Sequence, residues 1–555
     1  MVRARHLLST VAGILGAALL ATPSVQAQGA EASALSGTVT SAQEGAMEGV
    51  LVSAKKDGST ITTTVVSDDK GHFSFPASRL SPGHYSLKIR AVGYNLDGPN
   101  EANIAAGKAA TADIKLKKTG NLSAQLTNAE WMNSMPGTDE QKSFLQDCTG
   151  CHTLRLIVNS PYQAADFEKL IPKMGTYSPG SVPGRPQPLL PGLRANRGNT
   201  DSAQIKIAAD YLSTVNLSKG STWSYPLKTL PRPKGSATHV IITTYDLPRP
   251  EAMPHDVIVT KDGMVWYTDF GSQYFGQLDP KTGKVTDYPV PLLKPAAPKG
   301  LLELVPDEDG NLWGSMMYQA GVAMIDMKTK KVTAYPLPAE WQSGTTQESM
   351  VSPAHWHVDG YVWTNNQENH SILRLNVKTG KYENLGALKD QNGETISGYD
   401  IPTDKNNNLF LLEFGGVKIG RIDAKTKTLT TWKTPIPRAR PRRGHFDENG
   451  NLWFAEYGGN AIGMFDPETS AIKEWVLPIK WSLPYDAVSN AKGEVWTGSM
   501  LTDRVTRLDP KSSQFVDYLL PAETNIRRVF FDDTRNALWV GSNHGDAIIE
   551  VQPLD

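Results

Sequence analysis

The hydrophobic positions in the C-terminal part of the chain repeat with a nearly constant period. An aliphatic residue followed by Trp or Phe recurs at spacings of 47, 50, 47, 43, 43 and 43 residues. Most of these pairs follow an Asp, Asn or Gly turn, which is typical of a short strand. The pairs are Val265-Trp266, Leu312-Trp313, Val362-Trp363, Leu409-Phe410, Leu452-Trp453, Val495-Trp496 and Leu538-Trp539. Seven repeats of four strands predict a seven-bladed β-propeller over residues 238–555.

The two ends of this array indicate how the ring closes. The seventh repeat ends at Ile548–Val551 without a fourth strand. An unpaired strand of that type, Ile241–Pro248, precedes the first repeat. We expect the two to complete one blade together, because this covers the last sheet edge.

Residues 33–118 have short β-branched and aromatic segments separated by Gly, Asp and Pro turns, which predicts a small β-sandwich. The segments are Leu35–Val39, Val50–Ala54, Thr62–Val66, Gly71–Phe75 and Tyr85–Ile89. Their successive phrases G-T-V, G-V-x-V, S-D-x-x-G-x-F-x-F and L-x-P-G-x-Y-x-L resemble the carboxypeptidase regulatory-like domain. The resemblance implies an adhesive or stabilising module without catalytic residues.

Residues 125–220 have the amphipathic pattern of a small all-α domain, with helices expected at 140–151, 164–174 and 202–215. The whole chain is therefore predicted to be mainly β and multidomain: an N-terminal sandwich, a small helical domain and a C-terminal propeller. Residues 1–27 add a charged start, an apolar stretch and a Val25-Gln26-Ala27 end, which predicts a secretory signal peptide.

Export places the mature protein in the periplasm or outside the cell, with no membrane span after cleavage. The apolar stretch of the leader is short for an anchor. The net charge is -1, and no basic stripe is present, so a nucleic-acid partner is excluded.

The chain has two cysteines, and both lie in one motif. Cys148, Cys151 and His152 form C-x-x-C-H, the attachment motif of c-type haem. Structural zinc would need a second ligand pair, and a redox dithiol would favour a βαβ setting. We therefore predict one covalent haem c, with two thioether links and His152 as an axial iron ligand.

The surrounding region resembles a small class I cytochrome c domain, with Tyr211-Leu212 in the closing helix. Such domains often take a Met sulfur as the sixth iron ligand. Met174 is the only Met or His between His152 and the end of this region, and it is the candidate. The alternatives are a core role for Met174, with five-coordinate iron or another ligand.

The propeller repeats, with phrases such as Leu452–Glu456 and Ile419–Asp423, resemble virginiamycin B lyase (streptogramin lyase). That family opens a cyclic depsipeptide by elimination with Mg²⁺, a His entering the first strand of a blade and a Glu fourteen residues later. In an antiparallel pair these two positions lie at the same end, at the mouth of the central channel. The equivalent pairs here are His255 with Asp269, Tyr399 with Glu413, Arg442 with Glu456, Tyr485 with Ser499, and Arg528 with Ser542.

This column departs from the lyase pattern, because Arg442 stands where the His of the best-matching blade is expected. His445 comes three residues late and is expected to point elsewhere. His255, Asp269, Arg442 and Glu456 are the candidate catalytic residues. The next column inward adds Asp256, Glu303, Asp400, Arg443 and Asp486, and we place His355 and His357 in the equivalent strand of the third blade.

Together these side chains predict a ligand site at the mouth. Its carboxylates and imidazoles would suit Mg²⁺ or another divalent metal. Its arginines, Arg442, Arg443, Arg527 and Arg528, would suit a substrate carboxylate or phosphate. The alternative is that polar groups merely line a water-filled channel. His239, His370 and His544 are interpreted as structural.

Three functions remain open. The first is a haem-dependent oxidoreductase or electron-transfer protein, whose propeller binds a small substrate or a redox partner protein. The second is a carbon–oxygen lyase of the propeller mouth, with His255 as base and the haem accessory. The third is a non-catalytic electron carrier with binding modules. The complete haem motif favours the first or the third function, and the Arg at the lyase His position counts against the second; of these we favour the first.

Overall fold

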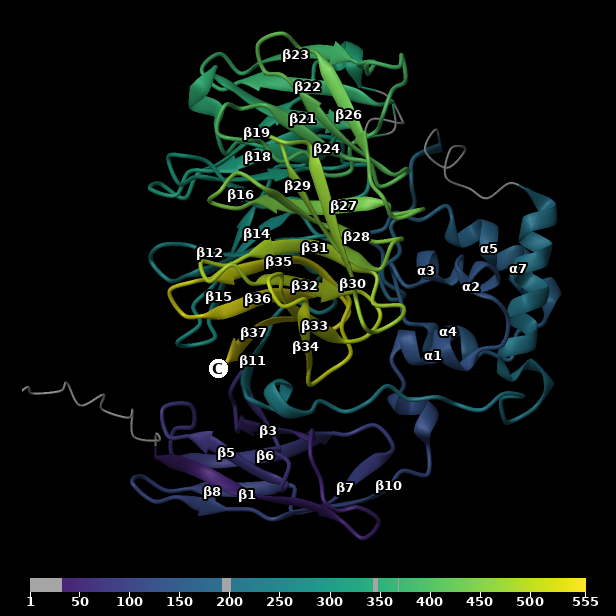
Figure 1. The fold of residues 1–555 in the computed structure, drawn as a ribbon, viewed down its shortest axis with the longest axis vertical. Coiled ribbons are helices and arrows are strands. Elements are labelled where there is room, and N and C mark those ends of the chain that lie inside the picture. The colour runs from purple at the N-terminus through teal and green to yellow at the C-terminus, as the bar shows by residue number, and fades with distance from the viewer. Residues whose placement is uncertain (1–31, 192–200, 343–347, 368) are drawn as a thin grey trace, which may run out of the picture.

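The computed structural model describes residues 32–191, 201–342, 348–367 and 369–555. They form a small sandwich, a ring of sheets and a helical segment against one end of the ring (Figure 1). The predicted signal peptide lies outside these residues. Within the described ranges, no helix is both long and apolar enough to cross a bilayer.

The ring contains seven antiparallel sheets, as the repeats predict, and the sheets of blades one to six follow one another along the chain. Blades one to three contain β12 (Pro254–Val259), β13 (Val265–Asp269), β14 (Tyr274–Leu278), β15 (Val285–Pro289), β16 (Val305–Pro306), β17 (Leu312–Ser315), β18 (Gly321–Ile325), β19 (Val332–Pro336), β20 (Glu348–Ser352), β21 (Tyr361–Asn366), β22 (Ser371–Asn376) and β23 (Lys381–Gly386). Blades four to six contain β24 (Leu409–Leu412), β25 (Lys418–Ile422), β26 (Leu429–Lys433), β27 (Pro441–Phe446), β28 (Leu452–Glu456), β29 (Ala461–Asp466), β30 (Ala471–Val476), β31 (Pro484–Ser489), β32 (Val495–Ser499), β33 (Arg504–Asp509) and β34 (Gln514–Leu519). In blade four, two isolated bridges, Asp400 to Leu412 and Thr403 to Leu409, stand in place of the first strand.

A hydrophobic cluster lies between every two neighbouring blades and holds the ring together. The repeated aromatic residue of the second strand is buried in these clusters, as Trp266 is between blades one and two. Burying such a side chain contributes about 1.5–3 kcal/mol. The repeated aliphatic–aromatic pair is therefore the packing unit of the ring.

The seventh blade closes the ring as expected. Its own strands are β35 (Ile526–Asp532), β36 (Ala537–Ser542) and β37 (Ala547–Pro553), and β11 (Val240–Asp246) pairs with β37 along its whole length. The other edge of β11 is also covered, because β11 pairs antiparallel with β4 of the sandwich, from Ile241 opposite Val65 to Tyr245 opposite Ile61. One eight-stranded sheet therefore runs from the ring into the N-terminal domain.

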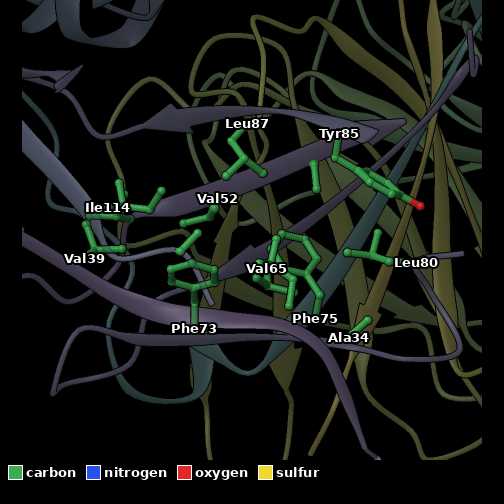
Figure 2. Packing of buried hydrophobic residues seen from close by; sticks show 14 of the residues in the cluster. Ala34, Val39, Val52, Val65, Phe73, Phe75, Leu80, Tyr85, Leu87 and Ile114 are labelled. Carbon is green, nitrogen blue, oxygen red and sulfur yellow. The ribbon is translucent and has the colours of Figure 1, made fainter. Parts of the chain in front are cut away.

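The N-terminal domain is the predicted β-sandwich. Its main strands are β1 (Ser33–Ser41), β3 (Leu51–Lys56), β4 (Ile61–Val66), β5 (His72–Pro76), β6 (Gly83–Arg90), β7 (Tyr94–Gly98), β8 (Glu101–Ile104) and β10 (Ile114–Lys118), with the short β2 (Gly45–Ala46) and β9 (Ala110–Thr111). Alternate residues such as Phe73 and Phe75 of β5 face inward and pack against Val52 and Leu87 (Figure 2). This core includes Ile241 of β11, and Leu51 and Val66 of the sandwich pack into the cluster between blades six and seven.

The helical segment contains α1 (Asn128–Ser134), α2 (Asp139–Lys142), α3 (Leu145–Cys148), α4 (Leu154–Val158), α5 (Ala164–Met174) and α7 (Ser202–Val215). The expected helices at 164–174 and 202–215 are confirmed. The expected helix at 140–151 is instead two short helices followed by tight turns. Its amides bond three residues back, as Ser143 does to Glu140 and Gly150 to Asp147, so a regular α-helix is not formed.

Candidate functional site

The end of the ring predicted to be an open mouth is covered by the helical segment. The amide of Ala129 donates to the carbonyl of Leu501 at 2.9 Å. Nδ2 of Asn525 donates to the carbonyl of Thr149 at 3.1 Å, and Nη2 of Arg527 donates to that of Gly150 at 3.0 Å. Apolar residues of the helices and of blades four to six share one cluster around Tyr485 and Trp481. The mouth of the channel is therefore one side of an interface with the helical segment. The C-x-x-C-H motif lies on the other side of this interface.

The thiols of the motif are unpaired, and burial raises the pKa of both, that of Cys148 to about 12. The sulfur of Cys148 lies 4.0 Å from the carbonyl of Phe144, and that of Cys151 lies 3.9 Å from the carbonyl of Pro179. Nδ1 of His152 lies 3.0 Å from the carbonyl oxygen of Thr153. A proton on Nδ1 donated to that carbonyl leaves the lone pair on Nε2, which is the form of His that binds a metal.

Met174, the predicted sixth ligand, is the last residue of α5, and 46% of its surface is exposed. The structure gives this role no support, and it remains a prediction.

A second imidazole lies under the motif. His544 follows β36. Both of its ring nitrogens are buried, and its hydrogen-bonding neighbour is the backbone of Gly150 in the motif. Burial and the nearby charges of Arg527 and His152 lower its pKa to about 3, so the ring is neutral. One feature of the sequence indicates that His544 lies near the mouth. It comes just past the second strand of its blade, and that end of the strand reaches the mouth.

Arg442 lies in a box of aromatic rings at the mouth. Its guanidinium carbon is 3.9 Å from the ring centre of Tyr485, 4.2 Å from that of Phe414 and 4.6 Å from that of Tyr457. The pKa of Tyr399 is lowered overall. Burial alone would raise this pKa, but the charges of Arg442 and Arg443 and the hydrogen bond from Tyr485 outweigh the effect of burial. The expected partner of Arg442, Glu456, forms no ion pair with it.

The predicted catalytic pair His255 and Asp269 is not brought together. His255 is fully buried, with Nδ1 2.5 Å from Asp256 and Nε2 3.0 Å from the Tyr485 hydroxyl. Asp269 instead accepts from Arg249 at 2.8 Å. Tyr399 also hydrogen-bonds Tyr485. A chain of hydrogen bonds therefore leads from Tyr399 at the mouth through Tyr485 and His255 to Asp256.

The remaining second-strand residues of the column bond within their own blades. Glu413 accepts from the amides of Val417 and Lys418, both at 3.1 Å. Glu456 lies beside Glu474, and burial, a hydrogen bond to the Glu474 carboxylate and the charge of that carboxylate raise the pKa of Glu456 to about 9. Glu456 is therefore a neutral carboxylic acid near pH 7.

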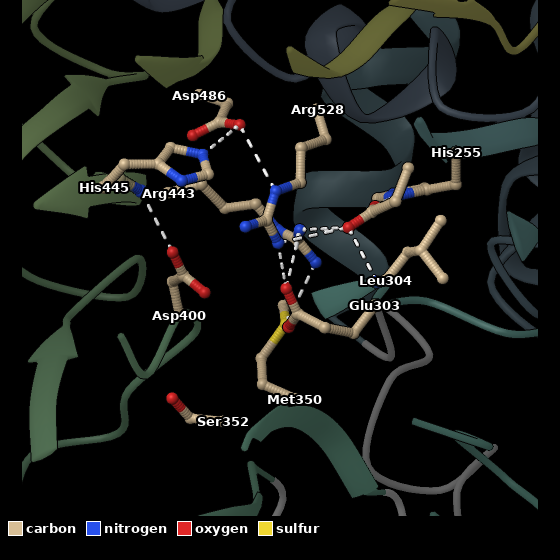
Figure 3. A network of polar contacts seen from close by, with 12 residues as sticks. His255, Glu303, Leu304, Met350, Ser352, Asp400, Arg443, His445, Asp486 and Arg528 are labelled. Carbon is tan, nitrogen blue, oxygen red and sulfur yellow. Dashed lines mark hydrogen bonds and ion pairs between the residues drawn. The ribbon is translucent and has the colours of Figure 1, made fainter. Parts of the chain in front are cut away.

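The inner column does form one network, which plugs the channel (Figure 3). Arg443 donates to Asp256 at 2.9 Å and to Glu303 at 3.3 Å, and Arg528 donates to the same two carboxylates. Asp400 and Asp486 complete the ring by accepting from backbone amides of the next blades, Gly444 at 2.9 Å and Val529 at 3.1 Å. Burial raises the pKa of Glu303 to about 8 despite both arginines. These buried groups tie the blades together, although Oε2 of Glu303 and Nε of Arg443 have no hydrogen-bond partner.

Two further expectations about histidines are wrong. His445 does not point away, because its Nε2 lies 3.0 Å from Asp486 inside the channel. His355 and His357 lie past the end of β20, in and beside the 3-10 turn Trp356–Val358, and face Glu308 at the opposite end of the strand from the mouth. The longer turn of this blade shifts them out of the column.

No three His, Cys, Asp or Glu side chains of the described residues are grouped so as to hold a metal ion. The expected divalent-metal site thus has no ligand set within these ranges.

Comparisons with known proteins agree with the two outer parts of the chain. Residues 391–554 match the virginiamycin B lyase family and residues 34–117 the carboxypeptidase regulatory-like domain. A streptogramin B lyase structure is 20% identical with a TM-score of 0.50, over 57% of this chain and 99% of that one. A virginiamycin B lyase structure from Staphylococcus aureus is 20% identical with a TM-score of 0.48, over 56% and 98%. None of the curated proteins compared with the chain matches it.

These matches define the class of the molecule, a mainly β multidomain protein with a lyase-like propeller and a regulatory-like sandwich. At this identity the solved structures show the fold alone. Neither family match covers the helical segment, which carries the motif at the centre of the site.

Proposed function

We propose that the chain is a haem c protein of the periplasm or cell exterior that transfers electrons, and that its propeller forms the second wall of the haem site. The observation that carries the proposal is the position of the C-x-x-C-H motif. It faces a propeller mouth that holds cations, aromatic rings and the buried imidazole of His544. The leader-like residues 1–27 support export, and covalent haem attachment takes place outside the cytoplasm.

The residues present fit a haem in three respects. Cys148 and Cys151 are free thiols one helical turn apart, and each can form a thioether. His152 is held by the Thr153 carbonyl with Nε2 available for iron. His544 supplies a buried imidazole beside the motif, which makes it, with the predicted Met174, a candidate to hold the iron together with His152.

The bound haem would supply one-electron redox chemistry. The chain's own residues exclude water from the mouth and hold a proton beside it. Tyr399 is the acidic end of the hydrogen-bond chain to His255, because the neighbouring arginines lower its pKa. A small-molecule substrate or a redox partner would exchange electrons at this site, and Tyr399 would exchange the accompanying proton.

The lyase alternative is disfavoured by the same geometry. A general base needs a free lone pair within reach of the substrate. Nε2 of His255 faces the Tyr485 hydroxyl, its Nδ1 faces Asp256, and the ring is fully buried. Glu456 is neutral and has no His partner. The fold is shared with the lyases, but the pair that their reaction implies is not assembled here.

The test is expression in a host that matures c-type cytochromes. The wild-type protein is expected to show a haem absorption spectrum that responds to reductant and oxidant. Cys148→Ala/Cys151→Ala is expected to fold without it. A matched control, Cys148→Ser alone, should retain haem through one thioether. A folded, exported wild-type protein without a haem spectrum would contradict the proposal.

A further inference from the structure

Three arginines at the covered mouth have no acidic partner. None of the ion pairs among the described residues involves Arg440, Arg442 or Arg527, although Arg443 and Arg528 just below them are paired with Asp256 and Glu303. Arg442 is 7% exposed and Arg527 is 3% exposed. The sequence placed Arg442 and Arg528 in the mouth column and Arg443 in the column inward of it. In the structure Arg528 instead joins Arg443 in ion pairs with Asp256 and Glu303, and the outer arginines have no ion pair among the described residues.

The hydrogen bonds of these outer arginines are also incomplete. Nε of Arg442 is buried without a partner, its Nη1 reaches the sulfur of Met500 at 3.5 Å, and the hydroxyl of Tyr399 is its other side-chain hydrogen-bond partner. Arg440 donates Nε to the carbonyl of Phe414, and Arg527 donates to Asn525 and Gly150. Asp147 lies within electrostatic range of Arg440 and Arg442 but forms no ion pair with either.

A cation removed from water is costly unless an anion or hydrogen bonds compensate it. Cation–π contacts with the surrounding rings compensate Arg442 in part. The rings of Tyr485, Phe414 and Tyr457 carry no negative charge, and they leave guanidinium N–H groups unused. An anion at the mouth would satisfy both the charge and these donors. Planar guanidinium groups bind a planar carboxylate through two parallel hydrogen bonds.

We propose that Arg442 and Arg527, with Arg440 beside them, form a carboxylate-binding site between the propeller and the C-x-x-C-H segment. The carboxylate has two possible sources. One is a propionate of the haem, a source that rests on the proposed function. The other is the carboxylate of a small organic acid that enters the mouth as a ligand, and this source stands whether or not haem is attached.

Calorimetric titration of the full chain with benzoate, succinate and inorganic phosphate separates the two sources. The haem-loaded wild type is compared with the haem-free Cys148→Ala/Cys151→Ala protein. If a propionate fills the site, only the haem-free protein binds benzoate or succinate. If a free acid is the ligand, both proteins bind it. In either case Arg442→Gln should weaken binding by about tenfold or more, because a charged hydrogen-bonding partner is lost.

The matched control is Arg438→Gln, since Arg438 is an exposed arginine that pairs with Glu140 of the helical segment. This variant should bind the carboxylates as its parent does. On loaded protein the midpoint potential adds a second readout. With a propionate in the site, Arg442→Gln should lower the potential, because a positive charge near the iron is removed.

The proposal is overturned if neither protein binds a carboxylate and Arg442→Gln leaves the potential unchanged. It is also overturned if phosphate binds more tightly than either carboxylate with the same dependence on Arg442. If the wild type carries no haem, the proposed function fails, but the titration of free carboxylates still decides this inference.

Discussion

Asp256 offers the sharpest test of how the ring is held together. Its carboxylate accepts from Arg443 at 2.9 Å, from Arg528 at 3.2 Å and from the amide of Leu304 at 3.1 Å, and it pairs with His255. All four partners are themselves buried. Replacing Asp256 therefore removes one charge and leaves several polar groups without compensation.

The expected magnitude follows from these contacts. Breaking a buried ion pair by removing one partner costs about 3–5 kcal/mol. Asp256→Ala should thus lower the free energy of unfolding by about 4 kcal/mol. For a propeller of ~320 residues this corresponds to a loss of about 6 °C in melting temperature. Asp256→Asn should cost about half as much, since its amide oxygen still accepts from Leu304.

The assay is urea unfolding followed by tryptophan fluorescence, with the denaturant slope checked for a change in the unfolded state. Glu448→Ala is the control, because Glu448 is an exposed turn residue of the same ring, and its change should stay within about 0.5 kcal/mol. A loss below about 1 kcal/mol for Asp256→Ala would refute the view that this network is desolvated and structural.

Three further predictions concern His544, Glu456 and the sandwich. His544→Ala should convert low-spin ferric haem to high spin, as measured by electron paramagnetic resonance. If only Met174→Ala caused this conversion, the ligand would be Met174 and not His544. Glu456 has a folded pKa raised to about 9, so the folded state holds an extra proton above pH 4.5 and its stability falls as pH rises toward 9. Glu456→Gln should therefore stabilise the protein more at pH 8 than at pH 5 in thermal melts, and an equal effect at both would contradict a raised pKa. Removing residues 33–118 uncovers the edge of β11, and the truncated protein should self-associate in gel filtration. Thr243→Lys places a charge on this edge and should reduce the self-association.

The sequence predicted those features that local patterns determine. The period of the Trp-containing strands gave the blades, and the missing fourth strand of the last repeat gave the pairing of β11 with β37. The alternating pattern of residues 33–118 gave the sandwich. In each case a strand or blade buries one face against its neighbour, and the hydrophobic period records that face.

The sequence did not predict contacts between parts of the chain far apart. The sandwich joins the ring through β4 and β11, and the helical segment covers the mouth through carbonyls of Thr149 and Gly150. Backbone carbonyls leave no mark in a residue pattern. The fourteen-residue column correctly placed residues near the mouth, but it could not show that Asp269 binds Arg249 or that His255 binds Tyr485. His544 was interpreted as structural because a lone His in a turn carries no motif.

Mass spectrometry of the peptide that contains both cysteines decides whether Cys148 and Cys151 hold a haem. Isolated under acidic denaturing conditions, this peptide should carry the mass of one haem on its two sulfurs. A peptide from correctly exported protein with two free thiols, or with a disulfide between them, would contradict this prediction.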